Sequence, residues 1–316
     1  MKRRQFLSLL AGAAAFPTAA YAQQRMPRVG VLTISGPDAM GPFREALRDL
    51  GYIEGRTIQI EMRSAEGRLD RLPELAAGLV RDKVDVIVAS QTPAVLAARN
   101  ATRDIPIVMG AAGDPIATGL VTSLARPEGN VTGLSATSAE LAAKNLELVR
   151  EILPNARRVG VVGNSEDPFV KPFLEQIENG ARATGFEIHS VLSRRNEEYE
   201  TAFAAISQQR ADAIILQGSL PARMVVDLAL KYRLPAVSNQ KYMVQAGALT
   251  SYSASFQERA RGIASYIDRI LKGARPADLP VQQPSTFELV INVKTARALG
   301  LTIPATLLAR ADEVIE

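Results

Sequence analysis

The stretch Val84-Asp85-Val86-Ile87-Val88-Ala89-Ser90-Gln91-Thr92-Pro93 contains the unit from which most of the chain is built. The run from Val84 to Ala89 is apolar except for Asp85, and it has the length of a buried strand. Three polar residues follow, and Pro93 then begins a short helix that ends near Asn100. A buried strand, a polar turn and a helix in this order predict the βα unit of an α/β fold.

The same unit recurs along the chain in two series. Strands of the first series are expected at residues 28–34, 57–63, 84–89 and 105–109, and an extended piece at 130–135 follows them. After a long helix near 139–153, the second series has strands at 158–162, 186–192, 211–216 and 235–238. Short apolar strands alternating with helices are typical of parallel sheets covered on both faces. The sequence therefore predicts an α/β protein with two doubly wound parallel-sheet lobes.

Extended pieces near residues 133, 251 and 284 interrupt the βα alternation. They predict that three crossover strands join the lobes and act as a hinge, with a ligand cleft between the lobes. The expected first lobe comprises residues 23–135 plus 252–281. The expected second lobe comprises residues 136–251 plus 282–316.

The first 22 residues have the pattern of a secretory signal peptide. A basic start, Met1-Lys2-Arg3-Arg4, precedes an apolar run from Phe6 to Ala15, and Ala20-Tyr21-Ala22 forms a cleavage site. We expect export to the periplasm with cleavage after Ala22. Arg3-Arg4-Gln5-Phe6-Leu7 also resembles the twin-arginine export motif, so both the twin-arginine and the Sec route remain open. Retention of the segment as an uncleaved anchor also remains open.

Composition excludes several classes of protein. Removal of the signal takes away three positive charges and no negative one, which lowers the net charge from +4 to +1 and leaves no basic footprint for nucleic acid. The chain has no Cys and one His, His189, so thiolate chemistry and multi-His metal sites are excluded. Neither a P-loop nor a dinucleotide-binding glycine motif occurs. We expect no catalytic residue, no metal and no cofactor.

Polar residues follow the predicted strands of both lobes. In doubly wound sheets the ligand crevice lies outside the carboxyl ends of the strands, where helix N-termini also offer free N–H groups. These positions predict a site for a small, polar-headed ligand that is bound and not transformed. The predicted ligand-binding residues are Ser35, Gln91, Thr92, Asp114, Asn164, Ser165, Gln217 and Asn239.

Several motifs resemble a substrate-binding family of ABC transporters, the family related to the tryptophan/tyrosine-binding protein. The motifs are Gly51-Tyr52-Ile53-Glu54-Gly55, Ala65-Glu66-Gly67-Arg68, Val84-Asp85-Val86-Ile87-Val88, Gly113-Asp114-Pro115, Leu124-Ala125-Arg126-Pro127-Glu128-Gly129-Asn130-Val131-Thr132-Gly133 and Leu301-Thr302-Ile303-Pro304. The resemblance covers essentially the whole chain. It implies a type I periplasmic-binding-protein fold, and characterised relatives bind an aromatic amino acid.

The resemblance also implies roles for some residues. Asp114 would pair with a ligand ammonium, and a ligand carboxylate would dock where Thr92 and Pro93 open a helix. Gln217-Gly218 replaces the Asp-Asn of the aromatic amino-acid binders, which argues against tryptophan itself. The candidates for aromatic contacts are Tyr242, Tyr252 and Phe169.

The combined prediction is a monomeric periplasmic solute-binding protein of an ABC importer. It would close its lobes on an amino acid or an aromatic or carboxylate compound and deliver it to a permease and its ATPase. Two alternatives remain open from the sequence: an exported periplasmic enzyme of the same architecture, and a ligand-sensing module for a membrane receptor.

Overall fold

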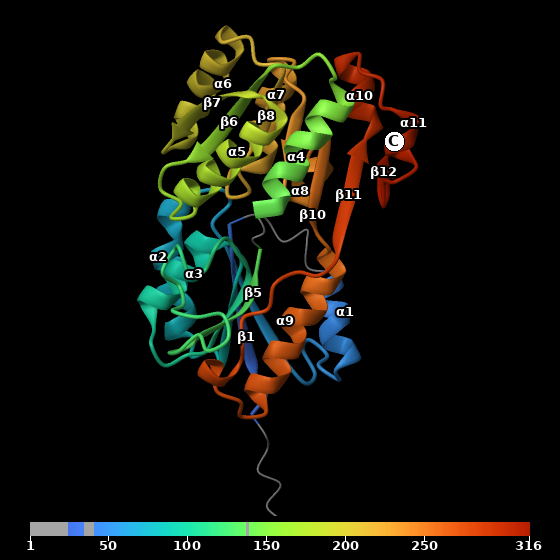
Figure 1. The fold of residues 1–316 in the computed structure, drawn as a ribbon. Helices are drawn as coiled ribbons and strands as arrows, with labels where there is room; N and C mark the ends of the chain where they lie inside the picture. Colours follow the sequence, from blue (N-terminus) through green and yellow to red (C-terminus); the bar gives the residue numbers. More distant parts are fainter. Residues whose placement is uncertain (1–24, 35–40, 137–138) are drawn as a thin grey trace, which may run out of the picture.

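A computed structural model describes residues 25–34, 41–136 and 139–316. The predicted signal peptide, residues 1–22, and the predicted ligand-binding residue Ser35 lie outside the described residues. The described chain forms two lobes, each built around one β-sheet with helices on both faces (Figure 1). The predicted two-lobed α/β architecture is confirmed.

The first lobe contains a five-stranded parallel sheet with the strand order β2-β1-β3-β4-β5. Its strands are β1 (Arg28–Thr33), β2 (Gln59–Ser64), β3 (Val86–Ala89), β4 (Ile107–Ala112) and β5 (Val131–Ser135). Every residue of β3, β4 and β5 is buried. This explains why these strands read as continuous apolar runs, whereas a strand with one exposed face alternates in polarity.

Helices cover both faces of this sheet. They are α1 (Gly41–Asp49), α2 (Leu72–Arg81), α3 (Thr92–Ala101) and α9 (Phe256–Leu271), together with the short 3₁₀ helices η2 (Leu69–Arg71) and η4 (Pro276–Asp278). The α2 and α3 helices pack on one face around Leu79 and Met109, and α1 and α9 pack on the other around Phe43 and Ile267. Although α9 lies far from α1 in the sequence, the two helices are neighbours in the first lobe (Figure 1).

The second lobe contains a seven-stranded sheet with the order β12-β11-β10-β9-β8-β6-β7. Its strands are β6 (Arg158–Asn164), β7 (Glu187–Ser193), β8 (Ala213–Leu216), β9 (Ala236–Ser238), β10 (Thr250–Ala254), β11 (Phe287–Asn292) and β12 (Glu313–Ile315). All neighbouring strands of this sheet are parallel except β10 and β11. These two are antiparallel because the chain leaves the second lobe at the end of β10 and re-enters it at the adjacent start of β11.

The sequence pattern predicts the longer helices of the second lobe but not its shortest elements. The elements are α4 (Ala139–Ile152), α5 (Val170–Thr184), α6 (Tyr199–Gln208), α7 (Ala222–Lys231), α8 (Lys241–Gln245), α10 (Val293–Leu299) and α11 (Ala305–Leu308), with the 3₁₀ helix η3 (Asn196–Glu198). We did not predict α8, α11 or β12. Each is too short for an apolar period to be visible.

In the described part of the chain, the backbone passes between the lobes three times: between β5 and α4, between β10 and α9, and between η4 and β11. Two of these connections are tied together, since Ser255 N donates to Thr286 O at 2.9 Å. Glu258, in the first turn of α9, accepts hydrogen bonds from Ser285 Oγ (2.5 Å) and Thr286 N (2.9 Å). We call Ser255, Glu258, Ser285 and Thr286 the hinge cluster. The exact residues that bound the lobes stay a prediction.

Candidate functional site

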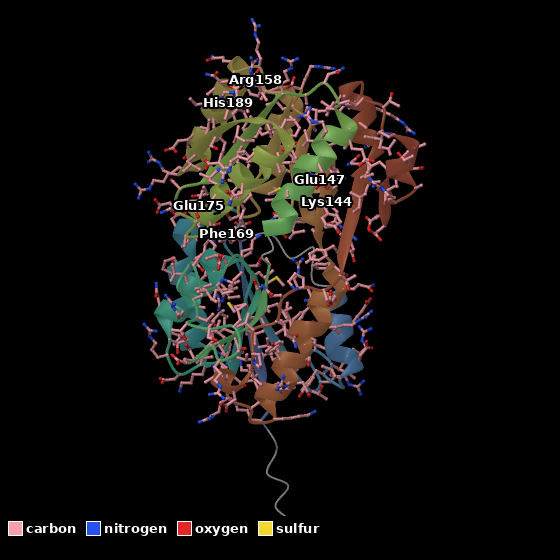
Figure 2. The ribbon with its side chains drawn as sticks, in the orientation of Figure 1. Lys144, Glu147, Arg158, Phe169, Glu175 and His189 are labelled. Atoms are coloured by element: carbon pink, nitrogen blue, oxygen red, sulfur yellow. The ribbon has the colours of Figure 1, made fainter. Side chains whose placement is uncertain are left out.

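The two lobes touch at positions where glycine leaves room for a side chain of the other lobe. A Cβ atom added to Gly113, after β4, would lie 2.5 Å from the ring of Phe169, which precedes α5. A Cβ added to Gly67 would lie 2.7 Å from Cβ of Pro221, before α7. Figure 2 shows Phe169 at the edge of the second lobe that faces the first lobe. The described structure therefore has its lobes in close contact.

Gln91 forms a direct polar bridge between the lobes. Its Nε2 donates to Tyr242 Oη at 2.5 Å and to the Gly218 carbonyl at 3.0 Å. The Tyr242 hydroxyl in turn donates to the same carbonyl. The backbone of Gln91 has φ 71° and ψ 157°, a region that is almost exclusive to glycine and costs about 1–3 kcal/mol for other residues. Strain of this kind is concentrated at ligand clamps and switches.

A cavity of about 590 Å³ lies between the lobes on the α9 side of this bridge, and we call it the interlobe cavity. It is lined by the carboxyl ends of β1, β3 and β4, by the first two turns of α9, and by the starts of α7 and α8. Its walls are largely apolar. The apolar residues include Val31, Phe43, Val88, Met224, Phe256 and Ile263.

Arg259 brings a positive charge to this apolar cavity. The residue is partly buried, and its burial lowers the pKa of the guanidinium. The guanidinium carbon lies 5.2 Å from the centre of the Phe256 ring. Among the described residues, Arg259 has no hydrogen-bond or ion-pair partner for its side chain. Its N–H donors are therefore available to a ligand.

A much smaller chamber, of about 40 Å³, lies on the other side of the Gln91 bridge and shares Gln91, Ala111 and Gln240 with the interlobe cavity. A space of this size holds ordered water and no metabolite. Two acceptors of residues that line it, Gln91 Oε1 and Asn239 Oδ1, are buried and have no partner among the described residues. The chamber and the cavity therefore have three lining residues in common, one of which is the bridging Gln91.

A buried carboxylate, Asp167, lines the small chamber. Its oxygens accept hydrogen bonds from Gln217 Nε2 at 2.8 Å and from Phe169 N at 2.9 Å. Burial raises the pKa of Asp167, and the hydrogen bond from the Phe169 backbone opposes that rise. Gln217 Oε1 also accepts from Asn164 N at 2.7 Å, so the Gln217 amide is engaged within the second lobe.

The structure brings some of the predicted ligand-binding residues together and separates others. Gln91, Thr92, Gln217 and Asn239 line the small chamber. Thr92 is buried, and its Oγ accepts from Gly113 N at 3.0 Å, which links α3 to the loop after β4. The role of these four residues in binding stays a prediction.

The remaining predicted residues lie elsewhere. Asn164 lines a separate, charged groove of about 850 Å³ between the lobes, in which Arg194 pairs with Glu166 at 3.0 Å. Ser165 is exposed, and Asp114 Oδ1 accepts from Ala117 N at 2.9 Å within a turn. Neither lines the interlobe cavity or the small chamber. Their proposed contacts with a ligand stay predictions.

The aromatic candidates fall in three different environments. Tyr242 lines the interlobe cavity, and Phe169 lines the small chamber. Tyr252 stacks on Phe287 beside the hinge cluster, with ring centres 5.7 Å apart. Sequence reasoning missed Arg259 and Asp167. The prediction used polar residues directly after strands, and neither residue fits that pattern. Arg259 lies inside α9, and Asp167 lies three residues after the end of β6.

Among the described residues, no group of three or more His, Asp or Glu side chains could hold a metal ion. The single histidine, His189, has its Nε2 3.1 Å from Glu187 Oε1 and lies at the end of the second lobe away from the first (Figure 2). Within the same described residues, no helix is both long and apolar enough to span a bilayer.

Comparison with known proteins gives consistent matches over nearly the whole chain. A family model described as ABC transporter substrate binding protein matches residues 31–315. A protein from Clostridioides difficile (strain R20291), named as a tyrosine-binding protein, is 30% identical over 266 residues, which cover 82% of this chain and 75% of that protein.

Two solved structures each match 92% of this chain, and in each case the match covers 99% of the solved chain. An ABC domain in complex with L-Trp from Streptococcus pneumonia is 28% identical and has a TM-score of 0.81. The ligand-free, open structure of a substrate binding protein with adhesive properties from Clostridium difficile is 26% identical and has a TM-score of 0.63. More distant matches show that the fold is that of type I periplasmic binding proteins.

Proposed function

This chain belongs to the family of ABC transporter substrate-binding proteins, and on that premise we propose that it binds one small ligand in the interlobe cavity by closing its two lobes. The observation that carries the proposal is the cavity itself. Its volume, about 590 Å³, falls within the range of roughly 300–1,000 Å³ that small-molecule sites occupy.

Both lobes contribute to the walls of the cavity, with Ser90 and Phe256 on the first lobe and Met224 and Tyr242 on the second. A ligand in this position makes its full set of contacts only when the lobes are together. It therefore shifts the population toward the closed form by the difference between its affinities for the two forms. Hinge closure is the expected consequence, with the hinge cluster as the segment that bends.

The closed arrangement of the described structure is supported by the two solved relatives. Sequence identity and coverage are nearly the same in the two comparisons, so the gap between TM-scores of 0.81 and 0.63 reflects geometry. The larger score belongs to the relative with bound L-Trp, and the smaller to the relative described as open. Lobe separation is a simple explanation of that gap.

The ligand we propose is a small compound with an apolar body and a polar head, such as an amino acid or an aromatic carboxylate. The apolar walls suit the body, and Arg259, Gln91 and Tyr242 supply polar contacts. A tyrosine-binding relative and a relative in complex with L-Trp support this class. We further propose that the protein works as a monomer in the periplasm after cleavage following Ala22, without catalysis, and delivers its ligand to a permease with its ATPase.

A thermal shift experiment tests the proposal. The mature protein, beginning at Gln23, is heated with a panel of amino acids, aromatic acids and related metabolites. At a concentration 100 times the dissociation constant, a ligand stabilises the native state by about 2.7 kcal/mol, which corresponds to a rise of roughly 5 °C or more in the melting temperature. If no compound raises the melting temperature, the proposed ligand class is contradicted.

A further inference from the structure

Resting on the proposed function, we infer that Arg259 is the carboxylate anchor of the interlobe cavity, and that the ligand is an apolar monocarboxylate whose amino group, if present, contributes little to affinity. The inference depends on the charges that line this cavity and on the partners that each of them has. It concerns a residue of α9, a helix that carries none of the predicted ligand-binding residues.

Arg259 differs from the other unpaired arginines of the described residues. The other arginines without a side-chain hydrogen bond or ion pair are exposed, as Arg269 on the same helix is. Arg259 alone among them is partly buried, and burial lowers the pKa of its guanidinium. A partly buried guanidinium without a protein partner is less well solvated than an exposed one, and a carboxylate is the partner whose geometry matches its paired N–H donors.

The neighbouring acidic residue does not neutralise Arg259. The charge of Glu288 reaches the guanidinium, but no hydrogen bond or ion pair joins the two side chains. Glu288 instead accepts from Ser255 Oγ at 2.5 Å and lies 3.9 Å from Lys241 Nζ. The N–H donors of Arg259 therefore face a cavity in which no protein acceptor takes them.

Among the described residues, the lining of the cavity provides no matching anion for a ligand ammonium. Glu66 is the acidic residue in its lining, but this side chain is 73% exposed and pairs with Arg71 at 2.9 Å. Arg223, exposed at the start of α7, adds a second positive charge to the lining. The buried Asp167 lies in the small chamber and is already hydrogen-bonded. The charge balance of the described residues that line the cavity therefore favours an anion over a zwitterion.

The surroundings of Arg259 also indicate the rest of the ligand. The guanidinium lies over the ring of Phe256, and both side chains line the cavity together with Phe43 and Ile263. A carboxylate on Arg259 would place the remainder of the molecule against these apolar side chains. The ligand class is thus a carboxylate carried by an aromatic or branched aliphatic body.

Three compounds share an indole ring on a two-carbon chain and differ in the charged groups that they carry, so they test the carboxylate and the ammonium separately. Indole-3-propionate has only the carboxylate, tryptamine has only the ammonium, and L-tryptophan has both. Isothermal titration calorimetry with the mature protein is expected to show indole-3-propionate binding at least as tightly as L-tryptophan and at least tenfold more tightly than tryptamine.

The variant Arg259→Gln is expected to lose at least tenfold in affinity for indole-3-propionate, while its affinity for tryptamine stays unchanged. Arg269→Gln, which removes an exposed charge from the same helix, is the matched control and should bind like the native protein.

The possible outcomes distinguish this inference from the proposed function. If L-tryptophan binds but tryptamine equals indole-3-propionate, or if Arg259→Gln leaves indole-3-propionate binding unchanged, the anchor is overturned and the proposed function stands. If none of the three compounds binds, the proposed aromatic ligand class is contradicted and the anchor is overturned with it. Circular dichroism of the ligand-free variants confirms that each remains folded.

Discussion

Gln91 Nε2 lies 2.5 Å from Tyr242 Oη, and this hydrogen bond joins two residues that are 151 positions apart and belong to different lobes. The pair stands between the interlobe cavity and the small chamber, and both residues line the interlobe cavity. The contact joins the two lobes directly. Gln91 makes this contact from a backbone conformation that is strained for a residue with a side chain.

The first prediction concerns this bridge. Gln91→Ala removes two hydrogen bonds that exist only between closed lobes, each contributing about 0.5–1.5 kcal/mol. One kcal/mol multiplies the population of the open form about fivefold. Small-angle X-ray scattering of the ligand-free variant should therefore give a larger radius of gyration than the native protein. Gln208→Ala, an exposed position on α6, is the control. Identical scattering for native protein and Gln91→Ala would show that the bridge does not hold the lobes.

The second prediction concerns the packing of Phe169 on Gly113. A Cβ at position 113 would lie 2.5 Å from the ring, and overpacking of this kind costs about 1–3 kcal/mol. The cost applies to the closed form alone, so Gly113→Ala should weaken ligand binding about tenfold while both lobes stay folded. Calorimetric titration measures the loss. Gly41→Ala, where a Cβ meets no atom within 4 Å, should bind normally.

A double-mutant cycle makes this prediction specific. In a Phe169→Ala background the ring is absent, so Gly113→Ala should cause little further loss of affinity. Equal losses of affinity in both backgrounds would mean that Gly113 is required for its backbone conformation and not because it leaves space for the Phe169 ring.

The third prediction is a pH dependence of the hinge cluster. The hydrogen bond from Ser285 outweighs burial and holds the pKa of Glu258 below its ordinary 4.5. Because the folded-state pKa is lowered, the stabilisation is fully present above pH 4.5 and is lost as the pH falls below that value toward the folded-state pKa. In urea unfolding at pH 7, Glu258→Gln should be less stable than the native protein by about 0.5–1.5 kcal/mol. The difference should shrink when the pH is lowered through 4.5. A difference that stays constant from pH 7 to pH 3 would contradict this account, and Glu45→Gln on α1 is the control for an exposed charge.

The fourth prediction separates binding from stability at Arg259. The side chain has no hydrogen bond to lose, and burial disfavours its charge. Arg259→Met keeps the length and apolar contacts of the side chain without the charge. The ligand-free melting temperature should therefore be unchanged or higher, as occurs when a functional group is retained at the expense of stability. A clear fall in the ligand-free melting temperature would show that Arg259 supports the fold itself.

Much of the fold could be predicted from the sequence, because its strands are buried on both faces and read as apolar runs. The strands β3 and β8 are fully buried runs of this kind, and turn residues mark their ends. The antiparallel pairing of β10 with β11 could not be predicted in the same way. Its direction depends on where the chain re-enters the second lobe, a tertiary relationship that local patterns do not contain.

The site was less predictable than the fold. Polar residues after strands led to Gln91 and Asn239, which lie together at the small chamber. The same rule gave Ser165, which is exposed, since it uses position along a strand and takes no account of side-chain direction. Arg259 could not be predicted in this way. What marks it is a partly buried charge without a partner, and this becomes visible only when the packing around α9 is known.

A crystal structure of the mature protein with indole-3-propionate or L-tryptophan bound tests the central claim most directly. The account predicts ligand density in the interlobe cavity, in contact with Arg259 on the first lobe and Tyr242 on the second, with the lobes closed. Ligand density in the charged groove beside Arg194, or on the outer surface of one lobe, would contradict it.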